Sequence, residues 1–350
     1  MPSLSRPLGA LCLLLLSLSI GAPVALAQES GQGGTLRQRL IERWLERKAS
    51  RDEAKLPPAE TASGQAITTP GDHRFTLSVG GRQRSYLLHV PRVVQGGRPL
   101  PLWVALHGGG GSARIMADDA NYGLVSASER HGFVVVFPNG ISRISSGALA
   151  TWNAGRCCGA ARDEGVDDVA FIRTVVGQVQ GMLPIDRQRI YATGMSNGGM
   201  MAQRLACEAA DVFRAIASVA GTDNTTGCSP SRPIAVLHIH AKDDPHVLFN
   251  GGAGGFRDES KVTDFTSVPE TIRRWVGRDH CSAAPRNVLS RPGANCERYT
   301  GCAGGAQVQL CVTDTGGHSW PGTTKSAPGK EGPSQAIRAN DVIWDFFQGL

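Results

Sequence analysis

The sequence Gly-Met-Ser-Asn-Gly at residues 194–198 has the glycine–serine–glycine spacing of a serine nucleophile. An apolar run, residues 189–193, predicts a strand immediately before it, and residues 197–208 predict a helix immediately after it. This strand–turn–helix context is that of a nucleophile elbow, in which a sharp turn holds the serine hydroxyl above a sheet. The flanking glycines are needed because a Cβ atom there would collide with the neighbouring strand and helix. We therefore predict that Ser196 is a nucleophile.

A serine nucleophile needs a general base, and the base needs a carboxylate that orients it. In an elbow architecture the carboxylate and then the histidine follow the serine, each after the end of a strand. His318 lies in a glycine-rich loop between a predicted strand, residues 307–312, and the final predicted helix. Asp243 and Asp244 both follow the predicted strand at residues 234–240, and periodicity does not separate them. His318 is therefore the predicted base, with one of the two aspartates behind it.

Acyl transfer at a serine also needs hydrogen-bond donors for the negative charge that develops on the carbonyl oxygen. One donor is expected to be the backbone N–H of Asn197, the residue after the nucleophile. The run His-Gly-Gly-Gly-Gly at residues 107–111 follows a predicted strand and matches the loop that supplies the second donor, placed here near Gly109. A phosphate-binding loop is the disfavoured alternative, because the run lacks the Lys-Ser/Thr of a P-loop and the spacing of a dinucleotide loop.

Three histidines form a weaker candidate site for a metal ion. His238 and His240 alternate on one predicted strand and so face the same way, and His246 follows shortly after. Histidines in such a place are more often hydrogen-bonded neighbours of an active-site loop. We therefore predict that the protein binds no metal.

Two further groups of residues have structural and functional interpretations. The acidic cluster Asp163, Glu164, Asp167 and Asp168 precedes a predicted helix, so we interpret it as a helix cap with N-terminal charges rather than as a cation site. Trp152 and Trp320 are candidate substrate contacts, with core packing as the alternative for Trp152. Trp320 is two residues past His318.

The elements that must position these residues are predicted from two patterns. Short apolar runs predict strands, and the segments between them with helical spacing of apolar residues predict helices. The predicted strands are residues 74–79, 83–90, 100–106, 133–137, 189–193, 234–240 and 307–312, and the predicted helices are residues 112–130, 168–182, 197–208, 268–277 and 334–347. This alternation predicts an α/β protein with a largely parallel central sheet and helices on both faces. Gly80 and Gly81 predict a hairpin between the first two strands, which adds an antiparallel N-terminal edge.

Residues 1–27 have the features of a secretory signal peptide. Arg6 is the one charged residue before Glu29, residues 8–20 form an apolar run, and Ala-Leu-Ala at residues 25–27 matches a cleavage site. The run is too short for a membrane-spanning helix, and no other stretch approaches the length of about 18 apolar residues that such a helix needs. The sequence therefore predicts export to the periplasm or the medium, without stable membrane insertion.

Residues 28–72 are expected to connect the signal peptide to the catalytic domain at residues 73–350. Residues 36–48 predict a basic amphipathic helix, and residues 56–72 predict a linker. Such a helix either packs on the core or binds a membrane surface or a partner, and packing is the preferred interpretation.

The composition is that of a folded protein and argues against nucleic-acid binding. The chain has 350 residues, of which 41% are hydrophobic and 19% are charged, enough for a sizeable core. Lys and Arg number 36 against 30 Asp and Glu, a formal net charge of +6, but no basic block with interleaved aromatic residues occurs. We therefore predict no nucleic-acid partner.

Cysteine usage agrees with an oxidising compartment. The chain has nine cysteines, and removal of Cys12 with the signal peptide leaves eight, an even number that predicts four disulfides. Cys157 and Cys158 are adjacent, and because a ring closed by neighbouring cysteines is strained, we expect each to bond to a different partner. A zinc site is the disfavoured alternative, because the spacings lack a paired C-x-x-C pattern.

Five motifs occur in an order that characterises one protein family. They are LHGGG at residues 106–110, WNAGRCCG at residues 152–159, VDDVAFI at residues 166–172, GMSNGGM at residues 194–200 and GHSWPG at residues 317–322. On these motifs the chain resembles the polyhydroxybutyrate depolymerase family, which is closely related to secreted feruloyl and acetylxylan esterases. The resemblance covers residues 73–350.

This resemblance implies an α/β-hydrolase fold and a Ser-Asp-His triad. The triad falls on Ser196, Asp244 and His318 of this sequence. Asp244 is selected because the family pattern H-G-T-x-D-x-x-V aligns with residues 240–247, where this chain has Ala and Lys in place of the Gly and Thr. The resemblance implies no cofactor.

The sequence thus predicts a secreted serine esterase. Ser196 attacks an ester carbonyl, and His318 takes the serine proton and then gives it to the leaving alcohol. The first hypothesis for the substrate is a hydroxyalkanoate polyester or its oligomers, and the alternative is a feruloyl or acetyl ester of a plant polysaccharide. A non-catalytic hydrolase-fold binding protein is a third hypothesis, disfavoured by the complete triad. Because no linker or folded segment follows the final predicted helix, we expect soluble esters and oligomers to react faster than semicrystalline polymer.

Overall fold

A computed structural model describes the larger of two compact units, Arg43–Leu350. The described residues are 44, 47, 57–61, 65–144, 147–253, 264–282, 284–324 and 332–350. The predicted signal peptide lies outside the described residues, as does the predicted basic helix apart from residues 44 and 47, which are helical. Within the ranges described, no helix has both the length and the apolar character that crossing a membrane requires.

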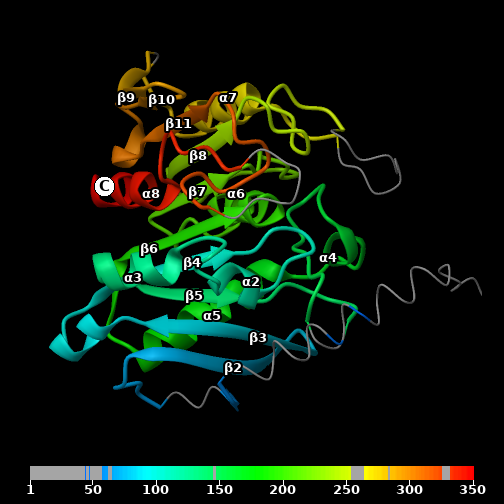
Figure 1. Cartoon of the computed structure of the whole chain (residues 1–350), viewed down its shortest axis with the longest axis vertical. Coiled ribbons are helices and arrows are strands. Elements are labelled where there is room, and N and C mark those ends of the chain that lie inside the picture. Colours follow the sequence, from blue (N-terminus) through cyan, green and yellow to red (C-terminus); the bar gives the residue numbers. More distant parts are fainter. Residues whose placement is uncertain are drawn as a thin grey trace, which may run out of the picture. The chain divides into compact units, whose positions relative to one another are not determined.

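One sheet of eleven strands forms the centre of this unit (Figure 1). In spatial order the strands are β1 (Ala59–Thr61), β2 (Gly71–Val79), β3 (Arg82–Val90), β5 (Val134–Pro138), β4 (Leu100–Leu106), β6 (Ile185–Met195), β7 (Ala215–Val219), β8 (Ala235–Ala241), β11 (Val308–Thr313), β10 (Ala294–Tyr299) and β9 (Arg286–Arg291). The strands from β5 to β11 in this order pair in parallel. The pairs β2–β3, β3–β5, β10–β11 and β9–β10 are antiparallel. The predicted α/β class and antiparallel N-terminal edge are confirmed.

Helices cover both faces of the sheet. They are α2 (Ala113–Ala117), α3 (Leu124–His131), α4 (Gly159–Asp163), α5 (Asp168–Met182), α6 (Asn197–Glu208), α7 (Val268–Arg278) and α8 (Ala339–Gln348), with 3-10 turns η1 (Arg92–Gly96) and η2 (Ala303–Gly305). Along β4, Leu102 and Val104 belong to a buried cluster with α5, α6 and α7, whereas Trp103 belongs to a second cluster with α2, α3 and α8. Successive residues of a strand face opposite sides, so the two clusters are the two faces of the sheet.

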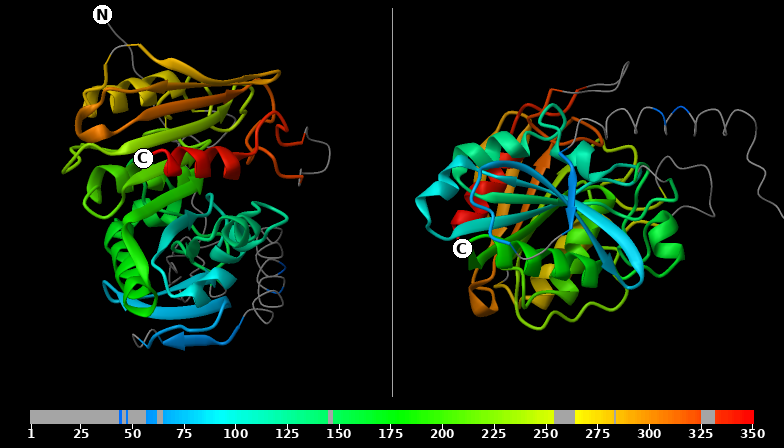
Figure 2. Two further views of the ribbon diagram at one scale, coloured as in Figure 1. Left: turned by 90° about the vertical axis from the view of Figure 1, so that its left-hand side faces the viewer. Right: turned by 90° about the horizontal axis from the view of Figure 1, so that it is seen from below.

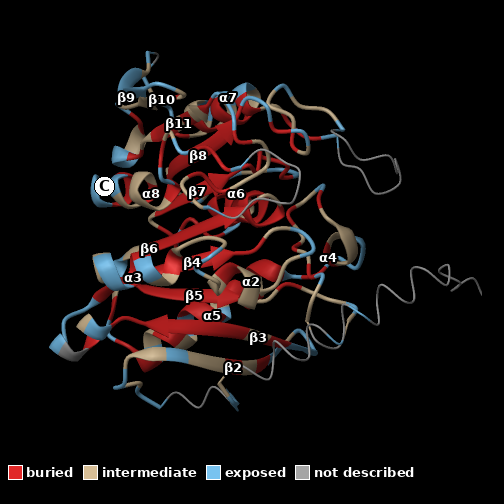
Figure 3. Ribbon diagram, in the orientation of Figure 1, coloured by how far each residue is buried: buried red, intermediate tan, exposed pale blue. Residues whose placement is uncertain are grey.

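The further views show the twist of the sheet and the distribution of buried residues over it (Figure 2, Figure 3). The strands turn progressively from β2 to β11, as the right-handed twist of strands requires (Figure 2). The central strands are buried, and burial falls off toward β2 and β9 at the two sides of the sheet (Figure 3). Because β4, β6, β8 and β11 run in parallel, their carboxyl ends meet at one edge. The predicted triad and oxyanion residues follow these carboxyl ends, as does Trp320 after β11, whereas Trp152 follows β5.

The predicted helix at residues 112–130 is wrong in its centre, where the chain forms a turn between α2 and α3. The Asp119 side chain accepts hydrogen bonds from the N–H groups of Val125 (2.9 Å) and Ser126 (3.0 Å) at the start of α3. Gly123, the N-cap residue, has a φ of 64°. Aspartate and glycine favour such caps and turns, so these local preferences end one helix and begin another.

Four strands were not predicted from the sequence. β7 is a buried stretch of small and apolar residues, in which alternation carries no signal, and β1 lies inside the predicted linker at residues 56–72. β9 and β10 form a hairpin around Gly293, whose outer strand is exposed and polar. Backbone pairing with a neighbouring strand defines these elements, and the pattern of their side chains does not reveal that pairing.

The final helix, α8, begins at Ala339, later than the predicted start at residue 334.

The eight cysteines of the described unit form four disulfides, as predicted. The pairs are Cys157–Cys158, Cys207–Cys228, Cys281–Cys302 and Cys296–Cys311. The expectation that Cys157 and Cys158 bond to different partners is wrong. The other six cysteines pair with one another across the fold, so each of the two neighbours has only the other as a partner.

Candidate active site

The nucleophile turn joins the end of β6 to the start of α6. Ser196 has a φ of 56° and a ψ of −121°, a conformation that residues other than glycine rarely adopt. An added Cβ atom on Gly194 would collide with the backbone of Gly198, and one on Gly198 would collide with the carbonyl oxygen of Leu106. The flanking glycines are therefore required by close backbone approach, as the elbow interpretation demands.

Hydrogen bonds fix this turn on both sides of the serine. The Ser196 N–H donates to the carbonyl oxygen of Val219 on β7 (2.8 Å), and the Ser196 carbonyl oxygen accepts from Met200 N–H in α6 (2.8 Å). The Ser196 side chain makes no capping hydrogen bond to the helix that it begins. Its hydroxyl is therefore not used to cap α6, and it lies at the positive end of the α6 dipole.

Asp244 follows β8 and contacts the imidazole of His318. The His318 Nδ1–H donates to Asp244 Oδ2 (2.7 Å), while Oδ1 accepts from the N–H groups of His246 (2.8 Å) and Val247 (3.0 Å). Burial alone would raise the pKa of Asp244, but hydrogen bonds from His240 and His318 outweigh it and hold the pKa well below 3.8. Asp244 is therefore a buried carboxylate that stays ionised.

Asp243, the neighbouring candidate, has a different contact. Its Oδ1 accepts from Gly317 N–H (2.8 Å) and its Oδ2 accepts from Gly316 N–H (3.2 Å), the two residues before His318. Asp243 thus holds the backbone of the histidine loop, whereas Asp244 holds the imidazole. Sequence periodicity could not show which of the two aspartates contacts the histidine ring. In the structure that residue is Asp244.

His318 follows β11 and presents one ring nitrogen to the site. Because Nδ1 faces Asp244, Nε2 is the nitrogen that can accept a proton from a serine hydroxyl. The His246 ring lies edge-on to the His318 ring, with centroids 5.2 Å apart. Both histidines come from loops at the carboxyl edge of the sheet, where the elbow also lies.

The glycine-rich run at residues 107–111, termed the oxyanion loop, lies against the elbow. An added Cβ atom on Gly108 would be 3.6 Å from Ser196 Cβ, and one on Gly109 would be 3.5 Å from Asn197 Cβ. Within the described part of the chain, neither glycine N–H has a hydrogen-bond acceptor. Asn197 is the first residue of α6, so its N–H has no intrahelical acceptor either. The predicted donors Gly109 and Asn197 are thus neighbours with free N–H groups.

His107 fixes the oxyanion loop from its buried side. Its Nδ1–H donates to the Gly108 carbonyl oxygen (2.8 Å), and its Nε2 accepts from Gly140 N–H (3.0 Å). Burial lowers the pKa of His107 to about 4, so the ring is neutral near physiological pH. This role was not predicted, although the motif that begins with His107 was recognised.

A second segment, residues 150–158, is tied to the elbow and is termed the clamp segment. The Asn197 side chain accepts from Trp152 N–H (2.7 Å) and donates to the Trp152 carbonyl oxygen (3.0 Å). The Trp152 indole N–H donates to the His107 carbonyl oxygen (2.9 Å). The buried Asn197 amide therefore joins the elbow to the clamp segment, and the Trp152 indole joins the clamp segment to the oxyanion loop. Sequence reasoning assigned Asn197 only a backbone role.

The two tryptophans named as candidate substrate contacts are buried. Trp152 is 0% exposed and Trp320 is 3% exposed. The Trp320 indole N–H donates to Asn340 Oδ1 at the start of α8 (3.0 Å), and its ring packs edge-on against Tyr122. These contacts support the surrounding loops, and substrate contact by either side chain stays a prediction.

A buried ion pair anchors the clamp segment to the sheet. Arg84 on β3 donates to Asp168 Oδ1 (2.7 Å), and Asp168 Oδ2 accepts from Asn153 N–H (2.8 Å). Burial raises the pKa of the Asp168 carboxyl, although the positive charge of Arg84 acts to lower it. Asp167 caps α5 by accepting from Ala170 N–H (2.9 Å), as the acidic cluster predicted. Asp168 does more than that interpretation assigned, because it holds the backbone next to Trp152.

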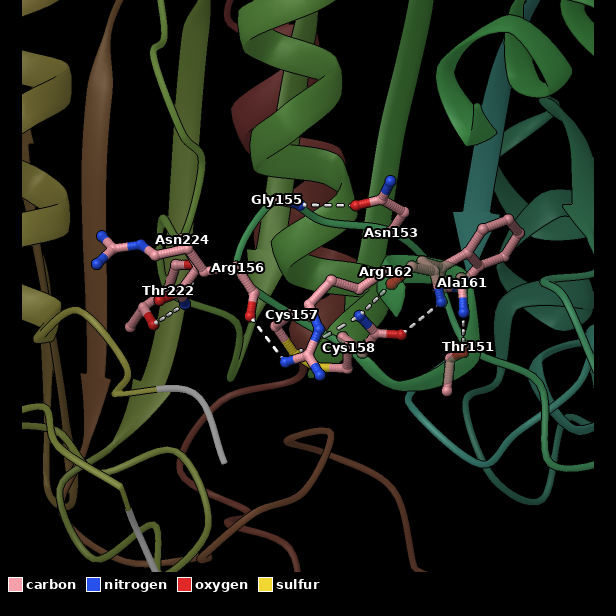
Figure 4. Close-up of a disulfide and its surroundings, with 12 residues drawn as sticks. Thr151, Asn153, Gly155, Arg156, Cys157, Cys158, Ala161, Arg162, Thr222 and Asn224 are labelled. Atoms are coloured by element: carbon pink, nitrogen blue, oxygen red, sulfur yellow. Dashed lines mark hydrogen bonds between the residues drawn. A yellow bond between two sulfur atoms is a disulfide. The ribbon is translucent and has the colours of Figure 1, made fainter. Parts of the chain in front are cut away.

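The disulfide between Cys157 and Cys158 closes the far end of the clamp segment (Figure 4). Cys157 Sγ lies 3.9 Å from the Asn197 side-chain nitrogen. Next to it, Arg156 N–H donates to the Asn224 carbonyl oxygen (3.0 Å), and Arg162 donates to the Arg156 carbonyl oxygen (3.3 Å). The clamp segment is therefore held at both ends.

His238 and His240 form a buried pair behind Asp244. Their facing nitrogens lie 3.0 Å apart, and His240 Nε2–H donates to the Val247 carbonyl oxygen (2.7 Å). Burial lowers the pKa of His238 well below 6.5. Among the residues that the structure describes, no three or more His, Cys, Asp or Glu side chains are grouped to hold a metal ion. Both nitrogens of His240 instead have protein partners.

Comparisons with known proteins place this geometry among esterases. A family model described as Esterase PHB depolymerase matches residues 84–258. The chain is 31% identical over 242 residues to feruloyl esterase B of Piromyces equi, covering 67% of this chain but only 42% of that relative. It is 30% identical over 282 residues to a probable feruloyl esterase C of Aspergillus niger, covering 78% of this chain and 87% of the relative.

A solved structure supports the fold. An acetyl xylan esterase from Aspergillus awamori superposes with a TM-score of 0.52 at 15% sequence identity, covering 76% of this chain and 94% of the other. At this identity the likeness shows the fold, which is that of the α/β hydrolases.

Proposed function

The chain belongs to the Esterase PHB depolymerase family, and we propose that it is a secreted serine esterase with Ser196, His318 and Asp244 as its triad. The observation that carries the proposal is the hydrogen bond between His318 Nδ1 and the buried carboxylate of Asp244. A strained serine elbow and a glycine loop with free N–H groups lie at the same edge of the sheet. These are the parts that acyl transfer needs.

In the proposed mechanism, His318 Nε2 takes the proton of the Ser196 hydroxyl as its oxygen attacks the ester carbonyl carbon. The carbonyl oxygen gains negative charge and is held by the N–H groups of Gly109 and Asn197. His318 then donates the proton to the leaving alcohol, and an acyl-enzyme forms. Water, deprotonated by His318, attacks the acyl carbon, and the serine takes its proton back as the acid leaves.

Asp244 serves this cycle by staying charged while His318 changes charge. Its low pKa keeps the carboxylate ionised, so it stabilises the imidazolium that forms in each half of the reaction. Asp243, which holds the loop backbone, acts as a positioning residue. His107 is neutral and brings no competing charge to the oxyanion loop.

For the substrate, we propose hydroxyalkanoate polyesters or their oligomers, following the family. The feruloyl esterase relatives favour a second candidate, an ester of a plant polysaccharide. The predicted signal peptide and the four disulfides support secretion. Trp152 and Trp320 are not needed as substrate contacts in this proposal.

The test is Ser196→Ala in the purified mature protein, assayed with hydroxybutyrate oligomers, methyl ferulate, p-nitrophenyl acetate and polymer film. We expect kcat to fall by roughly 10³-fold or more for every hydrolysed ester, because triad members act as a unit. Near-wild-type turnover in the folded variant would remove Ser196 as the nucleophile. The relative rates of the wild-type protein on the panel decide between the two substrate candidates.

A further inference from the structure

Leu149 is an exposed apolar side chain next to the clamp segment. Among the described residues, the exposed large hydrophobic side chains are Trp44, Leu149 and Val288. Leu149 is 43% exposed and Val288, on the edge strand β9, is 44% exposed. Single exposed hydrophobic residues are common and need no functional explanation by themselves. Leu149 differs from Val288 in its backbone conformation and in its neighbours.

The backbone at Leu149 is strained. Its φ is 55°, in the left-handed region, where the Cβ atom of an L-residue approaches the following carbonyl oxygen. Gly147, two residues earlier, has a φ of 70° and adopts the same region without that conflict. A leucine keeps such a conformation only where the surrounding structure enforces it. Residues with a strained backbone cluster at functional sites.

The neighbours of Leu149 connect it to the oxyanion loop. The adjacent residue, Ala150, donates to the Gly111 carbonyl oxygen (3.0 Å) and accepts from Gly110 N–H (2.9 Å). The same loop places Gly109 against Asn197. Two residues beyond Ala150, the backbone of Trp152 is paired with the Asn197 side chain. Leu149 therefore precedes a segment that is bonded to Gly110 and Gly111, next to the proposed donor Gly109, and to the side chain of Asn197.

From this placement we propose that Leu149 is a specificity-determining residue that contacts the apolar part of the ester substrate at the rim of the active site. The proposal rests on the proposed esterase function and deepens it by naming a substrate class. That class is esters with a large apolar group, such as an aryl ring, in preference to acetyl esters of small alcohols. Covering the exposed part of Leu149 with such a group removes apolar surface of both partners from water.

The test compares Leu149→Ser and Leu149→Gly with the matched control Val288→Ser. The substrates are methyl cinnamate, with an apolar acyl group, benzyl acetate, with an apolar alcohol, and methyl acetate as the reference. We expect both Leu149 variants to lower kcat/KM about fivefold for one of the two apolar esters, mainly through KM, and to leave methyl acetate unchanged. The ester affected identifies the side of the substrate that Leu149 contacts. The Val288 variant is expected to match the wild type on all three.

The glycine variant separates a binding role from a structural one. Glycine adopts a positive φ without strain, so Leu149→Gly is expected to keep or raise the thermal midpoint while it loses selectivity. A parallel fall in kcat/KM on all three esters would indicate a structural role and would overturn the proposal. Selectivity equal to wild type in both Leu149 variants would overturn it as well.

A binding measurement distinguishes failure of this proposal from failure of the proposed function. In the Ser196→Ala background, titration calorimetry measures the Kd of methyl cinnamate and of benzyl acetate with and without Leu149→Ser. We expect the Kd of one of these esters to rise about fivefold in the double variant. If the wild-type protein hydrolyses no ester, the proposed function fails, and this titration still decides on Leu149. An unchanged Kd for both esters contradicts the contact.

Discussion

The two sides of the nucleophile elbow are held in different ways. On the acid–base side, charged side chains carry the contacts: Asp244 binds the imidazole of His318, and Asp243 binds the backbone of the histidine loop. On the oxyanion side, neutral groups surround the donors: the His107 ring, the Asn197 amide and the indole of Trp152. An ion pair, between Arg84 and Asp168, acts there through the backbone of the clamp segment.

This difference follows from what each side does during acyl transfer. The acid–base side must move a proton and stabilise a cation, so it needs a charge of opposite sign in contact with the imidazole. The oxyanion side must present N–H groups in a fixed position, and preorganised dipoles do this without changing their own charge. We therefore expect mutations on the acid–base side to alter protonation and those on the oxyanion side to alter geometry.

The largest expected effect is on the acid–base side, at the two adjacent aspartates. Asp244→Asn is expected to lower kcat by about 10⁴-fold, the effect given for the equivalent change in a serine protease, because asparagine leaves the imidazole in the wrong tautomer. Asp243→Asn keeps an acceptor for the loop N–H groups and is expected to cost about tenfold or less. Steady-state kinetics of both variants on one ester measure the ratio. Equal losses would contradict the separate roles of Asp243 and Asp244.

Next in size is an effect on the oxyanion side. Asn197→Ala removes both hydrogen bonds to the backbone of Trp152 but keeps the proposed N–H donor. We expect kcat to fall by about 10²-fold, because a donor displaced by a fraction of an ångström stabilises the oxyanion poorly. KM and the pH profile are expected to change little. A shift of the pH profile instead would show that the clamp acts on the base and not on the donors.

The pH profile itself tests which side of the elbow titrates. Only neutral imidazole accepts the serine proton, so kcat/KM is expected to be lower at about pH 5 than at about pH 8. Asp244 stays ionised and His107 stays neutral over this range, because the pKa of each lies below it. His107→Gln is therefore expected to lower the rate without moving the midpoint of the profile. A shifted midpoint of the pH profile in His107→Gln would show that a group in the oxyanion loop changes its charge in this range.

The smallest expected effect is on stability, at the disulfide of the clamp segment. Replacing Cys207 and Cys228 by serine opens a link between residues 21 apart and is expected to cost about 3 kcal/mol of unfolding free energy. Replacing Cys157 and Cys158 opens a link between adjacent residues, which restricts the unfolded chain far less, and is expected to cost about 1 kcal/mol. Urea unfolding of the two double variants gives the comparison, and a larger loss at Cys157 and Cys158 would contradict it.

The sequence predicted the acid–base side better than the oxyanion side for a physical reason. Ser196, His318 and the aspartates are marked by local context, since each follows the end of a strand and lies among glycines or other polar residues. The supports of the oxyanion side are contacts between distant residues, such as Arg84 with Asp168, which are 84 positions apart. No local pattern indicates such a pairing.

Two of the errors have the same origin. The pairing expected for Cys157 and Cys158 considered only the strain of the ring, whereas the pairing that occurs depends on where the other six cysteines lie in the fold. β7 was missed because its position in the middle of the sheet, between β6 and β8, has no signature in five small and apolar residues. The third error is different, because Asp119 and Gly123 are residues that favour a turn within the predicted helix at residues 112–130. The prediction followed the helical spacing of the apolar residues there and gave these two residues too little weight.

The most direct test of the triad is covalent labelling with an organophosphonate followed by peptide mass spectrometry. The reagent reacts with a serine whose hydroxyl is activated by a neighbouring base, independently of which ester is the natural substrate. We predict one phosphonyl group per molecule, on the peptide that contains Ser196, and loss of the label in His318→Ala. A label on another residue, or none on the folded wild-type protein, would contradict the assignment of Ser196 and His318 as nucleophile and base.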